Sequence, residues 1–214
     1  MYTVITLVVL VVGVLGQCTK PVRRRELKSL SSVERFQFLR ALQKLHQKRN
    51  GTNVSEYEKY AGIHESYMQH GHGHPMFLPW HRQFIRNLEK DLQEIDSSVV
   101  FPYWDWTIDA AQPERSYIFQ PDYLGGNGQG DEACVGDGPF QGWNMSIPET
   151  HCLARDFDGG ETISPFVSRK VITHMLQIKE FSKFSERLEV AHGAIHNNVG
   201  GERGDLLPMW SPNE

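Results

Sequence analysis

Five histidines constrain the fold of this chain more than any other feature, because side chains that bind one metal must project toward a common point from rigid elements. They form a middle group and a C-terminal group: His64, His72, His81, His192 and His196. Imidazole suits copper, zinc, iron and nickel, and three neutral imidazoles leave a metal with an open side for a small ligand. Whether these histidines can bind a metal therefore depends on the helices and loops that carry them.

The middle group lies on predicted helices and on the loop between them. A capping-box pattern at residues 55–58 predicts a helix that carries His64 on its apolar side, and the same pattern at residues 31–34 predicts an earlier helix that ends near Asn50. Glycines and a proline within residues 71–75 break the second helix. We therefore expect the next histidine, His72, on a loop.

A third helix is expected to begin at about Pro79, since proline is favoured in a first turn, and to end near Asp96. Its inward stripe consists of His81, Phe84, Ile85, Leu88, Leu92 and Ile95. Its charged positions mostly face outward: Arg82, Arg86, Glu89, Lys90 and Glu94. This pattern is typical of a helix that packs on one side against a core.

The C-terminal pair lies on a helix predicted over residues 181–195 and beyond. His192 and His196 are four residues apart, so their Cβ atoms lie roughly 5–6 Å apart on one face. Such a pair also arises by chance and does not identify a metal site alone. A zinc-protease helix needs Glu directly after the first histidine, and Gly193 stands there instead, which removes the general base of that chemistry.

The remaining sequence indicates one domain. Residues 107–160 are rich in Gly, Pro and Asp with little periodicity, which is typical of a functional or stapled loop region, and residues 166–178 have a helical pattern. We therefore predict a mainly α fold, a helical bundle with its site between helices and with long Gly/Pro-rich loops. The formal net charge of −4 provides no electrostatic surface for nucleic acid or anionic lipid.

The N-terminus has the composition of a targeting segment. Residues 4–15 are almost unbroken aliphatic sequence, long enough for the apolar part of a signal peptide and too short to cross a bilayer. We expect a signal peptide over residues 1–16 and a secreted domain over residues 17–214. The absence of Lys or Arg before the apolar run is unusual, and a buried strand or membrane anchor is the alternative interpretation. No other segment is predicted to span a membrane.

Sequons and cysteines agree with secretion. Glycosylation sequons begin at Asn50, Asn53 and Asn144. An oxidising compartment would favour disulfide formation. Cys134 and Cys152 flank one glycine-rich loop and are the preferred pair, which leaves Cys18 without a partner in this sequence.

Several motifs occur together in an order that resembles the tyrosinase superfamily, the type-3 copper proteins that include catechol oxidases and molluscan haemocyanins. The matching segments are residues 61–64 (AGIH), 77–82 (FLPWHR), 101–106 (FPYWDW), 134–140, 151–153 and 188–201. The nine-residue step from His72 to His81 also matches the first copper half-site. The 134–140 and 151–153 segments resemble the disulfide-bearing loop of some members. The resemblance covers most of residues 31–213.

The resemblance implies two copper ions, each held by three histidines, with O2 bound between them. Copper A would be held by His64, His72 and His81. Copper B would be held by His192, His196 and a third histidine, which in the family follows a segment similar to residues 210–213 (WSPN). No histidine follows that segment here, so we expect copper B to be incomplete and the domain to be C-terminally truncated.

The resemblance also suggests roles for neighbouring residues. Glu189 would help to hold a water that deprotonates a phenol, with an exposed helix charge as the alternative. Gly193 replaces an Asn that is frequent in monophenol-active members, which favours diphenol oxidation. Arg82 and Asp105 are a candidate ion pair near the site. The other histidines are interpreted as surface or hydrogen-bonded polar residues: His46, His70, His74, His151 and His174.

Three functions are compatible with these features. The first is a copper-dependent phenol oxidase that uses O2 to convert a small o-diphenol to an o-quinone, with monophenol hydroxylation as a possible earlier step and with impaired activity in this chain. The second is haemocyanin-like O2 binding, which uses the same ligands. The third is a non-catalytic secreted copper-binding or matrix protein, which the expected absence of a copper B ligand favours. We predict the first and keep the others as alternatives.

Overall fold

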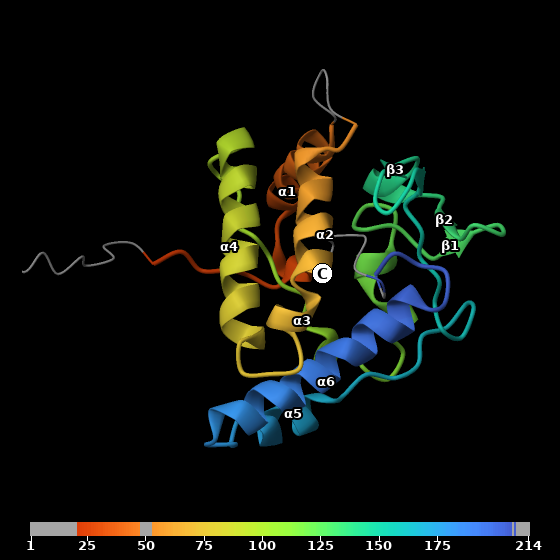
Figure 1. Cartoon of the computed structure of the whole chain (residues 1–214). Helices are drawn as coiled ribbons and strands as arrows, with labels where there is room; N and C mark the ends of the chain where they lie inside the picture. The colour runs from red at the N-terminus through yellow and green to blue at the C-terminus, as the bar shows by residue number, and fades with distance from the viewer. Residues whose placement is uncertain (1–20, 48–52, 207, 209–214) are drawn as a thin grey trace, which may run out of the picture.

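The computed structural model describes residues 21–47, 53–206 and 208 (Figure 1). The predicted signal segment, Cys18, Asn50 and residues 209–214 lie outside the described residues. Within them, the α-helices are α1 (Ser32–His46), α2 (Glu56–Ser66), α3 (Met68–Gly71), α4 (Phe77–Ile95), α5 (Arg169–Met175) and α6 (Phe181–Gly200). None of the described helices combines the length and the apolar character that a membrane span needs.

A long segment between α4 and α5 contains little regular structure. Two short antiparallel pairs lie within it: β1 (Gly128–Gln129) with β2 (Cys134–Val135), and β3 (Asn144–Met145) with β4 (His151–Cys152). Single 3-10 turns occur at Leu27–Ser29, Trp106–Ile108, Pro113–Arg115, Tyr117–Phe119 and Gly138–Phe140. The predicted mainly α fold with long Gly/Pro-rich loops is thereby confirmed.

The helices form a bundle beside this loop region. In Figure 1, α1, α2 and α4 stand side by side and α6 runs obliquely across one end of them, with the strand-bearing segment on the other side of the molecule. The helix α1 packs against both α2 and α4, and α4 also contacts α3 and α6. This arrangement brings α6, more than eighty residues later in the chain, next to the first turns of α4.

Both predicted capping boxes form. The Ser31 hydroxyl accepts the Glu34 N–H at 3.3 Å while the Glu34 carboxylate accepts the Ser31 N–H at 2.8 Å. Ser55 and Glu58 make the same reciprocal pair at the start of α2. These bonds satisfy N–H groups that a helix start leaves without partners, which explains why α1 and α2 begin where the sequence predicts. The helix α1 ends at His46, earlier than predicted.

The apolar stripes of the helices meet in one core. Leu88 and Leu92 of α4 are 1% and 0% exposed and pack with residues of α1 and α2, among them Leu42 and Tyr57. Burying a leucine fully contributes about 1.5–3 kcal/mol, so the predicted α4 stripe supplies a substantial part of the packing energy.

One charged residue of α4 contradicts the outward pattern. Glu89 is only 2% exposed, because the chain after α4 returns across it and its carboxylate accepts the Phe101 N–H at 2.9 Å. Arg24 and Arg86 also donate to Glu89, at 2.9 and 2.6 Å. Burial raises the pKa of Glu89, but these hydrogen bonds outweigh it and lower the pKa overall. Glu89 therefore fastens the N-terminal lead-in and residue 101 to α4.

Candidate metal centre

His64 lies in the last turn of α2 with its ring buried against α4. It is 1% exposed, its ring stacks on Trp80 with centroids 5.5 Å apart, and the Phe84 ring lies 5.3 Å away. This enclosure disfavours the imidazolium and lowers the pKa of His64 to about 4. His64 is therefore neutral at physiological pH, which is the form that binds a metal.

His72 follows α3, and His81 lies in the second turn of α4. The Nδ1 atom of His72 is 3.3 Å from the Met68 carbonyl oxygen, and that of His81 is 2.8 Å from the Phe77 carbonyl oxygen. A carbonyl only accepts, so both rings donate from Nδ1 and carry their lone pair on Nε2. Burial lowers the pKa of both rings, that of His81 to about 4.

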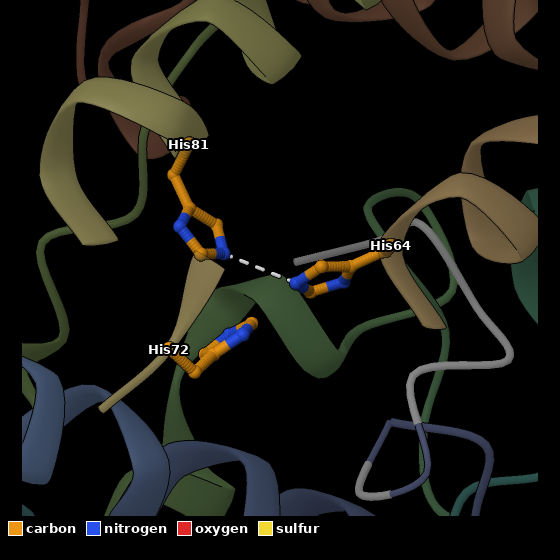
Figure 2. Close-up of side chains that lie close together, drawn as sticks. All are labelled: His64, His72 and His81. Atoms are coloured by element: carbon orange, nitrogen blue, oxygen red, sulfur yellow. Dashed lines mark hydrogen bonds between the residues drawn. The ribbon is translucent and has the colours of Figure 1, made fainter. Parts of the chain in front are cut away.

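The three rings point toward one another from α2, α4 and the loop between them (Figure 2). His64 Nε2 and His81 Nε2 are 3.0 Å apart, and one nitrogen of each of the three rings lies within 4.8 Å of the others. The distances and the donor type fit a metal site formed by three imidazoles.

The C-terminal pair has the same spacing. His192 Nε2 and His196 Nε2 are 2.9 Å apart, and His196 Nδ1 donates to the Leu206 carbonyl at 2.8 Å. Burial lowers the pKa of His192 to about 3, with a further contribution from His196. In the part of the chain that the structure describes, no third His, Cys, Asp or Glu completes a group around this pair.

The two sets of histidines meet across α4 and α6. The ring centroids of His81 and His192 are 6.1 Å apart. The Phe77 ring, which is 4% exposed, lies 4.5 Å from His81 and 5.2 Å from His192. Phe77 was not predicted as a site residue, although its place four residues before His81 puts it on the same face of α4.

An apolar cavity of about 400 Å³ adjoins the α6 pair. Its wall includes side chains of α1, α4, α6 and the segment after α4, among them Phe38, Leu42, Ile85, Phe101, Trp104 and Ile195, together with His192 and His196. Among the described residues, space thus lies beside these two histidines, between the helices and the loop region, whereas His64 is closely packed.

Glu189 lies one turn before His192 on α6 and is partly exposed. Its Oε1 atom accepts the Gly73 N–H at 2.7 Å. The carboxylate therefore ties α6 to the residue that follows His72. The general-base role stays a prediction, now with a competing hydrogen bond that any such role must accommodate.

The expected ion pair between Arg82 and Asp105 does not form. Asp105 instead pairs with Arg169 of α5 at 2.8 Å. The other carboxylate oxygen of Asp105 accepts the Thr107 N–H at 3.2 Å and so caps the turn at Trp106–Ile108. This local cap fixes the direction of the carboxylate toward α5.

The predicted disulfide between Cys134 and Cys152 is present and joins β2 to β4, with Cα atoms 5.6 Å apart. Glu132 lies near both sulfurs, but bonded sulfurs do not offer thiolate ligands to a metal. Asn53 and Asn144 are exposed, and their glycosylation remains a prediction.

The other histidines lie outside the two sets. The His46 ring stacks on Trp143 with centroids 3.9 Å apart. His151 Nε2 is 3.0 Å from the buried carboxylate of Asp205. The remaining three are exposed: His70, His74 and His174.

A family model and individual relatives both match this chain and agree on one protein family. The family model Tyrosinase, described as the common central domain of tyrosinase, matches residues 54–214. Tyrosinases from Streptomyces antibioticus and Streptomyces glaucescens are 38% and 35% identical to this chain, with 89% of it covered in each case and 76% and 75% of the relatives.

A solved structure supports the fold. A mutant polyphenol oxidase from Thermothelomyces thermophila matches with a TM-score of 0.70 at 22% identity, covering 88% of this chain and 65% of the other. The chain thus spans just under two thirds of that protein. Because the family match over residues 54–214 covers most of the chain and all five histidines of the two sets, the protein belongs to the tyrosinase family.

Proposed function

We propose that this protein is a copper-dependent phenol oxidase that uses O2 to convert small o-diphenols to o-quinones. The observation that carries the proposal is the convergence of two imidazole sets, with the rings of His81 and His192 6.1 Å apart. Family membership supports the same activity.

The residues present fit copper. The donors are imidazoles, which suit copper, and burial lowers the pKa of His64, His81 and His192 so that they are neutral ligands at physiological pH. The first ion would be held by His64, His72 and His81. The second would be held by His192 and His196, with a third ligand that the described residues do not supply.

When bound, the copper pair supplies O2 binding and electron transfer, while the chain supplies ligands, orientation and exclusion of water. The buried Phe77 ring contacts both His81 and His192 and shields one side of the two imidazoles from water. Beside His192, a Cβ placed on Gly193 would meet no atom of the described residues within 4 Å, so the structure leaves space next to this ligand. Each diphenol loses two electrons and two protons, and one O2 takes up those of two diphenols to form two waters.

Secretion is part of the proposal. It is supported by the apolar segment over residues 4–15, by the exposed sequon residues Asn53 and Asn144, and by the disulfide, since such bonds persist in oxidising compartments.

The test is copper content and oxidation of catechol by the full chain after copper loading and dialysis. We expect quinone formation with matching O2 uptake, and we expect His81→Ala to abolish both and to lower bound copper. The matched control is His174→Ala, which alters an exposed histidine of α5 and should leave all three readouts unchanged.

Each alternative function has its own outcome. Reversible O2 uptake without quinone would indicate haemocyanin-like binding instead. Bound copper with neither O2 uptake nor quinone would indicate a non-catalytic copper-binding protein.

A further inference from the structure

We propose that Asp205 and His151 are positioning residues for His196, holding it in the tautomer and direction that a metal ligand needs. This inference rests on the proposed function in one respect, namely that His196 binds copper. The family resemblance implies no metal-site role for either residue, and the sequence predicts His151 to be a surface or hydrogen-bonded polar residue.

Asp205 is a buried residue whose bonds all lead to the segment of residues 151–154, which includes β4. It is 1% exposed and follows the turn at the end of α6. Its Oδ2 accepts the Ala154 N–H at 3.0 Å, and its own N–H donates to the Ala154 carbonyl at 3.0 Å. A buried carboxylate is costly unless such partners satisfy it, so these bonds fix residue 205 tightly.

His151 is the second residue that contacts Asp205. Its Nδ1 donates to the Glu149 carbonyl at 2.6 Å, and its Nε2 is 3.0 Å from Asp205 Oδ1. Because Nδ1 already carries a proton, the contact between Nε2 and Oδ1 needs one more proton, on either atom, to be a hydrogen bond. The strand β4 that carries His151 is joined to β2 by the disulfide of Cys152, so the anchor itself is held firmly.

The next residue transmits this anchoring to the metal site. The Leu206 carbonyl accepts the Nδ1–H of His196 at 2.8 Å. This bond leaves the lone pair on Nε2, which lies 2.9 Å from His192 Nε2. Partners of this kind set both the tautomer and the direction of a ligating histidine. If Asp205 is released, the Leu206 carbonyl is free to move and His196 can adopt the other tautomer.

The chain offers a sharp set of variants. Asp205→Ala removes all side-chain bonds of the anchor, and His151→Ala removes one of them. Asp205→Asn keeps them, because the amide oxygen accepts from Ala154 and the amide N–H donates to His151 Nε2. Asp122→Asn is the matched control, since Asp122 is an exposed residue whose carboxylate pairs with Arg35 of α1.

The primary readout is the tautomer of His196 in metal-free protein, from NMR of 15N-labelled histidine above the imidazole pKa range. We expect the native protein, Asp205→Asn and Asp122→Asn to show a single Nδ1–H tautomer. Asp205→Ala and His151→Ala should show a mixture. In a titration with Cu2+ alone, paramagnetic broadening of the α6 pair should then require about 10–100-fold more copper.

A purely structural role gives a different result. If Asp205→Ala and His151→Ala lower the free energy of unfolding but leave the tautomer and the copper titration unchanged, the proposal is wrong. Should Asp205→Ala fail to fold, His151→Ala decides, since its partly exposed ring permits truncation. The tautomer of His196 is measured without copper or substrate. A negative result in this measurement is therefore distinct from a failure of the protein to oxidise phenols.

Discussion

Replacing His64 with Phe should remove much of the acid sensitivity of the metal-free protein. The native pKa of His64 is about 4, lowered by burial from 6.5. Between these values the unfolded chain binds a proton that the native ring does not, so stability falls as the pH falls through this window. Phe keeps the aromatic contacts with Trp80 and Phe84 but cannot take up a proton.

The size of the effect follows from proton linkage. With pKa values of about 6.5 unfolded and about 4 native, His64 alone should remove about 2 kcal/mol of unfolding free energy between pH 7 and about pH 4.5. The buried rings of His81 and His192 act in the same direction, but the three are close together and their contributions do not add simply.

Urea unfolding of metal-free protein at these two pH values measures the effect. The loss of stability should be about 2 kcal/mol smaller in His64→Phe than in the native protein. The exposed His174→Phe variant should show the native loss. An equal loss in the His64 variant would refute the reasoning, because it would mean that the buried ring does not resist protonation. Bound copper should protect the native protein, since metal and proton compete for the same lone pairs.

Three further changes test separate parts of the structure. If Glu189 is a general base, Glu189→Gln should lower kcat for diphenols about 100-fold, although the amide oxygen can still accept the Gly73 N–H. An unchanged kcat would mean that Glu189 only holds Gly73 through this hydrogen bond. Arg155 is 9% exposed and donates to the carbonyls of residues 124–126. Arg155→Met should therefore lower the free energy of unfolding in urea by about 2–5 kcal/mol. A decrease below about 1 kcal/mol would contradict a stabilising role for these hydrogen bonds. A side chain at position 193 would meet none of the described residues within 4 Å of its Cβ, so Gly193→Asn should fold normally. It should raise the ratio of monophenol to diphenol oxidation in parallel assays, and an unchanged ratio would contradict the role of Gly193 in diphenol preference.

Short sequence patterns correctly predicted the helices that carry the histidines of the site. The capping boxes at Ser31 and Ser55 place the starts of α1 and α2, because each is made by residues three apart that find one another within a single turn. The glycines around His72 and the stripe of α4 likewise act over short distances. Local pattern failed for Glu89, where a segment that follows α4 buries the outward face.

The sequence by itself determined the type and spacing of the donors. The four-residue spacing of His192 and His196 places both rings on one face of any helix that contains them, and the flanking of one loop by Cys134 and Cys152 predicted their disulfide. These properties depend on chain geometry over short distances or on chemistry that the residue types already carry.

Only the tertiary structure decided which distant groups meet. The approach of α6 to α4, the contact of Phe77 with His192, and the bond between Asp205 and His151 all join segments far apart in the chain. So does the pairing of Asp105 with α5. Such contacts depend on how whole apolar faces pack and on which buried polar groups then find partners, and neither is encoded in the local periodicity of one segment.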